Sequence, residues 1–337
     1  MVLEGDGGKS ADEVKSASGA VQFQNVSKRF GRITAVDQLS FEIKRGEIVG
    51  LLGPNGAGKT TAMRILTGYF PPSDGKVLIC GGDLFRTPHE TKKKIGYLPE
   101  SVSLYDDMRV MEFLTFVAEA KGVAKKKRRD HVEEKMARCG LWDVRNRLIG
   151  PLSKGFRQRA GIAQALIGDP EVLCFDEPTN GLDPKQIIEI RTLIRELGKD
   201  RTLILSTHVL PEVSMVCDRV LILNNGRLVA GGTAAELEAG INEPQEIYLV
   251  IGDVSRKEDA LRLLRGLNGV EAAVCIEERL EQAFLSLRAS KAVELRSVIT
   301  RKLVEHNIPL LEIRSGKLSL EDIFMKIVVR EEPQTVL

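Results

Sequence analysis

The sequence predicts an α/β protein with a parallel sheet core, an antiparallel β subdomain and a helical subdomain, followed by a small α+β domain. Three observations carry this prediction. The apolar run EIVGLLG leads directly into a glycine-rich loop and a helix, and the strands VLCFD and TLILST alternate with helical segments from about residue 171 onward. Such alternation is typical of a parallel sheet. After residue 245 the order becomes β-α-β-β-α-β, as in ferredoxin-like domains.

Composition places the chain among globular proteins and excludes several classes of function. Its 337 residues are 43% hydrophobic and 28% charged, and 49 basic against 47 acidic residues leave a net charge of +2, so no nucleic-acid partner is expected. The five cysteines form no C-x-x-C pair, which excludes a zinc site of that type and fits a reducing cytoplasm. No apolar run approaches the roughly 18 to 20 residues that span a bilayer.

The elements are expected in the following order. Residues 1–19 are rich in Gly, Ser, Lys and Asp and lack the apolar core of a signal peptide, which predicts a disordered leader. The alternation in VQFQNVSKRF and the β-branched ITAVDQLSFEI predict antiparallel strands. A charged helical pattern predicts the helical subdomain at about residues 101–168. The Gly, Asn and Pro of AGINEPQ mark a linker between a first domain, 20–240, and an accessory C-terminal domain, 245–330.

The basic run KKKRRD, residues 125–130, lies within the helical subdomain. A solvated helix face is the ordinary reading of such a run. Contact with anionic headgroups is the alternative, because each basic residue contributes on the order of 1 kcal/mol beside an anionic leaflet. The sequence leaves both readings open.

The segment GPNGAGKTT matches the pattern G-x-x-x-x-G-K-[ST] and stands between a strand and a helix, as a phosphate-binding loop requires. Its backbone N–H groups would wrap phosphate oxygens, Lys59 would reach the β- and γ-phosphates, and the Thr60 hydroxyl would bind Mg²⁺. The segment therefore predicts a nucleotide site. Its residues are Gly53, Pro54, Asn55, Gly56, Ala57, Gly58, Lys59, Thr60 and Thr61.

Two further strand ends carry candidate catalytic groups. The strand VLCFDE delivers Asp176, which would hold Mg²⁺ through water, and Glu177, which would polarise the attacking water. The strand TLILSTH ends in His208. A lone histidine is more often a packed or surface residue, but strand ends on the P-loop side of such a sheet also hold groups that sense the γ-phosphate.

The segment PLSKGFRQRAG predicts a helix start with Ser153 at the cap and Gly155 in the first turn. The free N–H groups and positive dipole end of such a helix can bind an anion. Most helices that begin with Ser bind no ligand, so this segment taken alone leaves the choice open.

The ordered set GPNGAGKTT, LSKGFRQR, VLCFDEPTNGLDP and STH resembles the nucleotide-binding subunit of ABC transporters over about residues 20–240. The resemblance implies ATP and Mg²⁺ as cofactors, Glu177 and His208 as catalytic residues, and Phe30 stacked on adenine. It also implies that Asp183 ends the loop that begins at Asn180. Ser153 and Gly155 would bind the γ-phosphate of ATP held by the opposite subunit.

The chain departs from the family pattern at three positions. Glu100 stands where the family has a glutamine that binds Mg²⁺ and links to the membrane subunit, and a carboxylate is still an oxygen ligand for the metal. The family's signature segment, LSGGQ, corresponds to LSKGF in this chain. Lys154 stands in place of its first Gly and Phe156 in place of its Gln, while Ser153 and Gly155 are kept.

The combination of YLPE, LSKGFRQR and LSLEDIFMKIV resembles the type-2 ABC exporters. This implies a cytoplasmic ATPase that is peripheral on the inner face of the cell membrane through a separately encoded transmembrane permease. A head-to-tail homodimer would enclose two MgATP at its interface, and hydrolysis would drive export. The segment SVSLYDDMRVMEF would form the permease-docking groove, although its apolar residues fit a helical core equally well.

Two other classes of P-loop protein are weighed against the transporter. Soluble ABC ATPases that act on ribosomes carry two cassettes in one chain, and those that act on DNA interrupt the cassette with long coiled coils; neither pattern occurs in this sequence. A P-loop kinase has no use for the signature segment or for the pair of Glu177 and His208.

Overall fold

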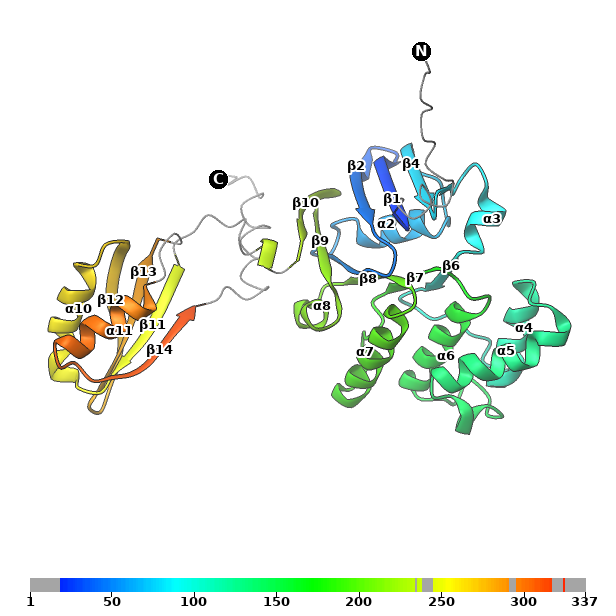
Figure 1. Ribbon diagram of the computed structural model, residues 1–337. Helices are drawn as coiled ribbons and strands as arrows, with labels where there is room; N and C mark the ends of the chain where they lie inside the picture. The colour runs from blue at the N-terminus through cyan, green and yellow to red at the C-terminus, as the bar shows by residue number, and fades with distance from the viewer. Residues whose placement is uncertain (1–18, 234, 238–244, 291–294, 317–323, 325–337) are drawn as a thin grey trace, which may run out of the picture. The chain divides into compact units, whose positions relative to one another are not determined.

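The computed structural model describes residues 19–233, 235–237, 245–290, 295–316 and 324 (Figure 1). The chain divides into two compact units, and the second begins at Ala235. The expected leader 1–19 lies outside the described residues except for Gly19, as does most of the expected linker and, except for Phe324, the segment LSLEDIFMKIV. In the part of the chain that the structure describes, no helix is both long and apolar enough to cross a membrane.

The first unit begins with the antiparallel subdomain that the sequence predicts. Its strands are ordered β2-β1-β4-β5. Their bounds are β1 (Val21–Phe30), β2 (Ile33–Ile43), β4 (Asp74–Ile79) and β5 (Gly82–Asp83). The inward side chains of β1, such as Val21 and Phe23, join a buried cluster with Met63 of α2 (Lys59–Leu66). The helix that follows the P-loop therefore packs between this sheet and the parallel one.

The core of the first unit is a six-stranded sheet ordered β10-β9-β3-β8-β7-β6, in which only β10 runs antiparallel to its neighbour. Strands β3, β7 and β8 are buried along their whole length, which explains their continuous apolar runs. The strands are β3 (Ile48–Leu52), β6 (Ile95–Leu98), β7 (Val172–Asp176), β8 (Thr202–Thr207), β9 (Arg219–Asn224) and β10 (Arg227–Gly232).

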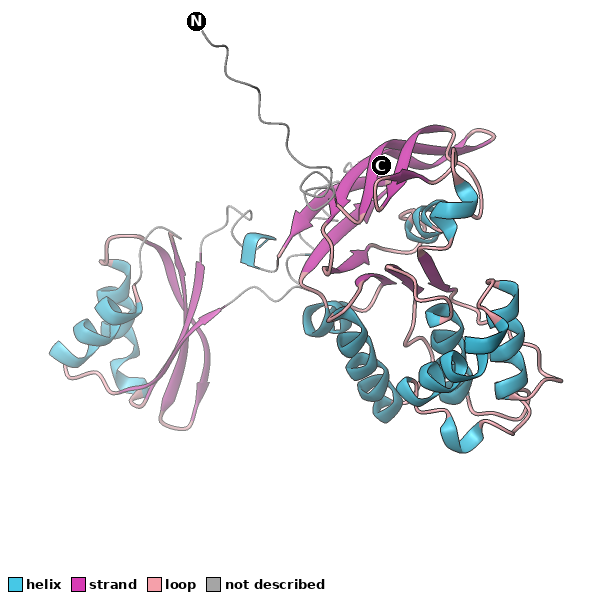
Figure 2. Cartoon of the chain, turned by 45° about the vertical axis from the view of Figure 1, so that its right-hand side comes forward, coloured by secondary structure: helices cyan, strands magenta, loops and turns pink. Residues whose placement is uncertain are grey.

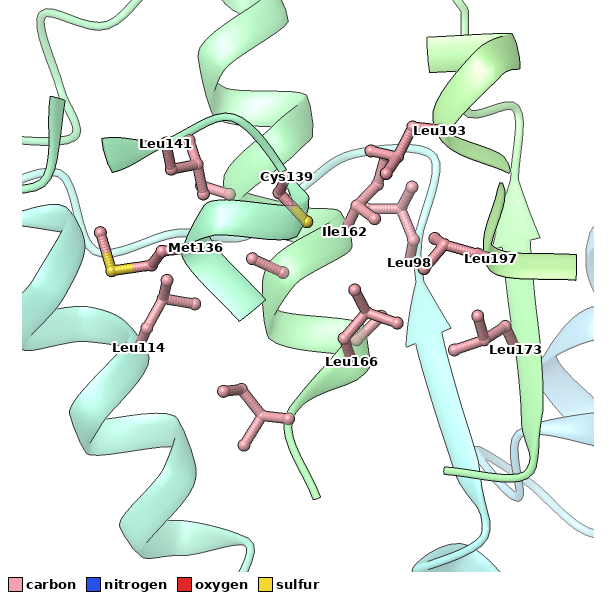
Figure 3. Close-up of a cluster of buried hydrophobic side chains, with 14 of the residues drawn as sticks. Leu98, Leu114, Met136, Cys139, Leu141, Ile162, Leu166, Leu173, Leu193 and Leu197 are labelled. Carbon is pink, nitrogen blue, oxygen red and sulfur yellow. The ribbon is translucent and has the colours of Figure 1, made fainter. Parts of the chain in front are cut away.

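The helical subdomain shares a hydrophobic core with one face of the parallel sheet. Figure 3 shows Leu114 and Met136 of the subdomain, Ile162 and Leu166 of α6, and Leu98 of β6 in one buried cluster. Because this core is continuous, the start of α6 is held in a defined place relative to the strand ends. The helices of the unit are α3 (Pro88–Lys92), α4 (Val110–Ala120), α5 (Lys125–Arg138), η1 (Trp142–Val144), α6 (Lys154–Leu166), α7 (Pro184–Gly198) and α8 (Leu210–Val216).

The basic run 125–130 forms the first turns of α5, where its lysines are exposed. Both of its arginines are engaged in ion pairs: Arg128 with Glu119 at 3.0 Å and Arg129 with Glu133 at 2.9 Å. The exposure of these lysines fits a solvated helix face. Contact with anionic headgroups would also require it, so both interpretations stay open.

The second unit has the β-α-β-β-α-β order that the sequence predicts. Its strands form an antiparallel sheet ordered β12-β13-β11-β14, with both helices on one face (Figure 2). This is a ferredoxin-like arrangement with its own core, to which Leu264 and Ile299 of the helices contribute. The elements are β11 (Gln245–Ile251), η2 (Val254–Arg256), α10 (Lys257–Arg265), β12 (Val270–Arg279), β13 (Gln282–Ala289), α11 (Arg296–Glu305) and β14 (Leu310–Gly316).

Candidate functional site

A cavity of about 480 Å³ lies in the first unit where the P-loop meets the residues that follow β6, β7 and β8. Its lining residues are 55–61 of the P-loop together with Ala35, Glu100, Glu177, Asn180 and His208. The carboxyl ends of parallel strands are where open α/β sheets bind their ligands. The fold thus gathers the P-loop, Glu100, Glu177 and His208 around one space.

The P-loop backbone depends on glycine at two positions for different reasons. Gly58 has φ of +98° and an ideal Cβ there would lie 2.5 Å from the carbonyl oxygen of Ala35. A Cβ on Gly53 would lie 2.4 Å from the carbonyl oxygen of Leu223 in β9. Gly58 is also the N-cap of α2 and supplies no side-chain acceptor. The first N–H groups of α2 are therefore available to an anion.

The ammonium of Lys59 is folded back on the P-loop. Its Nζ donates hydrogen bonds to the carbonyl oxygens of Gly53 at 2.7 Å and Pro54 at 3.1 Å. Burial lowers the pKa of Lys59, while the carboxylates of Glu177, Asp176 and Glu100 act in the opposite direction. These carboxylates favour the charged form, which is the form that binds phosphate.

Asp176 is the most deeply buried acid of the site, with 1% of its surface exposed. Burial raises its pKa, the hydrogen bond from the Ser206 hydroxyl opposes this, and the carboxylates of Glu100 and Glu177 raise it further. A divalent cation would relieve this crowding of negative charge, and Thr60 lines the cavity together with Glu100 and Glu177. The donor set therefore fits a hard cation.

Among the described residues, no group of three or more His, Cys, Asp or Glu side chains has metal-binding geometry.

Glu177 and His208 are in direct contact. The Nδ1 atom of His208 lies 2.8 Å from Oε1 of Glu177, and the Glu177 side chain is 11% exposed. The Glu177 backbone has φ of +47°, which is uncommon for a residue with a Cβ, and its N–H donates to the carbonyl oxygen of Ser206 at 3.0 Å. Such departures cluster at active sites. The arrangement is a carboxylate oriented by an imidazole.

Glu100 is tied to the loop that follows β7. The Nδ2 atom of Asn180 donates to Oε1 of Glu100 at 3.5 Å, and the Asn180 N–H donates to the carbonyl oxygen of Glu177 at 3.2 Å. A weak side-chain link and a backbone turn therefore connect the candidate metal ligand to the candidate base.

The starts of α6 and α7 form a second group of predicted residues. Ser153 is the N-cap of α6 and accepts a hydrogen bond from the Phe156 N–H at 3.4 Å, while Asp183 caps α7. A Cβ on Gly155 would lie 2.7 Å from Cδ of Gln186, so the two helix starts pack closely. None of Ser153, Gly155 and Asp183 lines the cavity around Lys59.

Phe30 also lies outside the cavity lining. Its ring is 47% exposed and meets Phe70 edge-on at 5.5 Å, and Lys28 Nζ lies 5.3 Å from the Phe30 ring centroid and 4.8 Å from that of Phe70. The prediction for Phe30 thus stays a prediction, with Phe70 as an unforeseen neighbour.

Sequence reasoning missed Ser206 and Ala35. Ser206 reaches Asp176 because the two residues are paired in register between β8 and β7. Only the strand order carries that information, and the serine in TLILST has no distinguishing local signal. Ala35 lines the cavity through its place in β2 and likewise offers no chemical signal.

Comparison with known proteins identifies several similar chains. The family described as "ABC transporter" matches residues 36–180. The bacitracin transport ATP-binding protein BcrA of Bacillus licheniformis is 33% identical over 91% of this chain and 97% of its own length. The daunorubicin resistance ATP-binding protein DrrA3 of Streptomyces coeruleorubidus is 31% identical over 92% of this chain and 96% of its own.

A solved structure of a dimeric ATP-binding cassette, in a post-hydrolysis state bound to ADP and Pi, is also similar. It is 26% identical, with a TM-score of 0.58, and the match covers 63% of this chain and 98% of the cassette.

Proposed function

This chain belongs to the ATP-binding proteins of ABC transporters, and from that premise we propose that it drives export through a separate permease by closing a homodimer around two MgATP. As a member of this family it is an ATPase. The observation that carries the proposal is the cavity in which Lys59, Glu177 and His208 meet, while the capped start of α6 lies outside it.

The proposed binding roles combine residues of the cavity wall with Asp176 and Phe30, which are not among its lining residues. The N–H groups at the start of α2 and the Lys59 ammonium hold the phosphates, and Phe30 stacks on adenine. Thr60, Asp176 and Glu100 are the proposed oxygen ligands of Mg²⁺, directly or through water. When bound, the ion neutralises charge on the phosphate oxygens.

In the proposed reaction Glu177 acts as general base. Its carboxylate accepts a proton from a water molecule as the water oxygen attacks the γ-phosphorus, and the bond to the leaving oxygen of ADP breaks. His208 lies 2.8 Å away and orients that carboxylate. In this role its Nδ1 is protonated and donates a hydrogen bond to Glu177. Glu177 lines the cavity, and its backbone has a positive φ of +47°.

The proposed dimer accounts for the residues that the cavity leaves out. Each chain has one P-loop and one segment around Ser153, at an anion-binding helix start that is separate from its own P-loop cavity. Head-to-tail packing would bring Ser153 and Gly155 of each chain to the γ-phosphate of ATP on the other, with Asp183 at the same interface. The dimeric state of the similar cassette supports this arrangement.

Export is favoured by the full-length relatives. BcrA and DrrA3 match more than nine-tenths of this chain, including its second unit, and their names specify transport and resistance. A resistance function is what outward transport of a toxic compound would provide, and these names favour a transporter over the soluble ribosome or DNA ATPases. The chain would then work on the inner face of the membrane, attached through the permease.

The predicted docking segment contains both core and surface residues. Phe113, the last residue of the segment, is buried in the helical subdomain, whereas Tyr105 is 53% exposed. Phe116, three residues beyond the predicted segment, is 47% exposed. The Tyr105 ring meets Phe113 and Phe116 edge-on at 5.9 and 5.8 Å. We therefore assign the exposed pair, Tyr105 and Phe116, to permease docking.

A mixed-dimer experiment tests the proposed function. One chain carries Lys59→Ala and the other Ser153→Arg, so that each homodimer has two defective sites. In a head-to-tail heterodimer both defects fall in one site, and the other site pairs an intact P-loop with an intact α6 start. Mixing should restore occlusion of radiolabelled ATP at one site per dimer. No gain over either variant alone would show that Ser153 does not act on the partner's ATP.

A further inference from the structure

The first turn of α6 contains two basic residues and no acidic one. Cations are disfavoured there, because the first turn lies at the positive end of the helix dipole. Arg157 is neutralised by Asp106, whose Oδ1 is 2.6 Å from the guanidinium. Lys154 is exposed and makes no ion pair with any residue that the structure describes. Its charge is therefore uncompensated within the described chain.

Lys154 lies directly against the loop that follows β7. An ideal Cβ on Gly181 would stand only 2.1 Å from Lys154 Nζ, and Gly181 has φ of +68°. Asn180, the preceding residue, donates its side-chain amide to Glu100. This loop therefore lies between an unpaired lysine on one side and an acid of the nucleotide cavity on the other.

Glu100 adds negative charge to a cavity that is already acidic. Among the described lining residues, Lys59 is the one lysine or arginine, and it faces Glu100, Glu177 and the underlying Asp176. The only hydrogen bond to the Glu100 carboxylate within the described chain is the 3.5 Å contact from the Asn180 amide. ATP brings further negative charge to this space, so the closed site would stay net negative even with Lys59 and one Mg²⁺ in place.

We propose that Lys154 supplies a further positive charge: its ammonium binds the γ-phosphate of the partner's ATP and offsets the charge of Glu100 across the dimer interface. This inference rests on the head-to-tail dimer of the proposed function. A lysine is suited to the task because its long flexible stem carries three donors and can swing from Gly181 toward a phosphate. Glu100 of one chain and Lys154 of the other thus form a charge pair across the dimer interface.

The test measures ATP-driven dimerisation of the full-length protein, with Glu177→Gln in every chain so that hydrolysis is slow. Light scattering after size exclusion gives the ATP concentration at half-dimerisation. Lys154→Gln should raise that concentration about tenfold, roughly the loss of one charge-assisted hydrogen bond. Lys154→Arg keeps the charge and should stay within about threefold of the parent. Lys126→Gln, at an exposed lysine in the first turn of α5, is the matched control and should have no effect.

The pairing with Glu100 is tested by a double-mutant cycle and by mixing. In a Glu100→Gln background, Lys154→Gln should raise the ATP concentration at half-dimerisation by less than about threefold, because the negative charge that Lys154 offsets is gone. A heterodimer of a Lys154→Gln chain with a Glu100→Gln chain has one intact site and one site that lacks both charges. It should form at lower ATP concentration than the Lys154→Gln homodimer.

The outcomes separate this inference from the proposed function. If the parent stays monomeric in ATP, the head-to-tail dimer is wrong and the inference falls with it. If the parent dimerises but Lys154→Gln has no effect, or an equal effect in both backgrounds, only the inference is overturned. It is also overturned if Lys154→Gln lowers the melting temperature without nucleotide, because Lys154 would then brace Gly181 within its own chain.

Discussion

His208 Nδ1 lies 2.8 Å from Glu177 Oε1, although the two residues are 31 positions apart in the sequence. They follow adjacent parallel strands whose ends are paired in register, with Asp176 opposite Ser206. Glu177 has a positive φ of +47°, directly after β7, and its carboxylate meets the histidine. This pairing would give Glu177, the proposed general base, a defined orientation.

Glu177→Gln should lower ATP hydrolysis by about 10²- to 10⁴-fold, because the amide keeps the shape of the side chain but cannot accept the proton from water. ATP binding should be retained. Phosphate release and nucleotide titration measure the two effects. Glu196→Gln, the same change on the exposed face of α7, is the control and should leave both unchanged. Undiminished turnover in the Glu177 variant would remove it from the role of base.

His208→Ala should impair hydrolysis more than binding. Loss of a hydrogen bond to a charged group costs about 1.5 to 3 kcal/mol, which corresponds to about 10- to 100-fold in rate. The substitution should lower kcat, because in the proposed mechanism the histidine orients the base and not the nucleotide. An unchanged kcat would identify His208 as an ordinary surface residue.

Gly53→Ala should weaken ATP binding about tenfold while the protein stays folded. The new Cβ would be 2.4 Å from a backbone oxygen of β9, so the P-loop has to shift, and overpacking of this kind costs about 1 to 3 kcal/mol. Gly266→Ala is the control, since its Cβ would meet its nearest neighbour at 3.4 Å. Equal ATP affinity for the Gly53 variant and wild type would contradict the tight contact with β9.

Asp176→Asn should raise the melting temperature at pH 7 in the absence of Mg²⁺. Burial raises the pKa of Asp176 in the folded state, so ionisation opposes folding and this group's stabilisation is lost as the pH rises through that pKa. Asparagine removes the charge and can still accept the Ser206 hydrogen bond. The melting temperature should rise by about 2 to 4 °C for each kcal/mol of destabilisation that removal of the buried charge relieves.

The rise expected for Asp176→Asn should shrink as the pH falls through the raised pKa of Asp176, because the native carboxyl then takes up a proton. Asp143→Asn, on an exposed acid, is the control for the loss of one charge. A lower melting temperature for Asp176→Asn than for wild type at pH 7 would show that the buried charge is stabilised in the folded protein.

Deletion of residues 245–337 should leave a folded, nucleotide-binding cassette. The buried cluster of the second unit draws only on residues from Ile247 to Ile308, and neither buried cluster of the first unit includes any of them. Cooperative thermal unfolding and ATP titration of the truncated chain are the measurements. A broad, non-cooperative transition would mean that the first unit needs the second to fold.

The sequence by itself determined the parts whose chemistry is contiguous. The P-loop could be predicted because its strand, turn and helix follow one another within residues 48–66, and the candidate acids Asp176 and Glu177 stand at the end of a strand that is otherwise apolar. The order β-α-β-β-α-β of the second unit could likewise be derived from local periodicity. Short-range patterns specify such elements because side-chain spacing decides which faces are buried.

Only the tertiary structure decided which of these parts meet. Strand β8 lies between β3 and β7, and that order alone brings Ser206 to Asp176 and His208 to Glu177. The contact of Lys154 with Gly181 likewise exists only after α6 packs into the core it shares with β7. Strand order and helix packing depend on burial of side chains that are far apart in sequence, and no local pattern encodes which of them become neighbours.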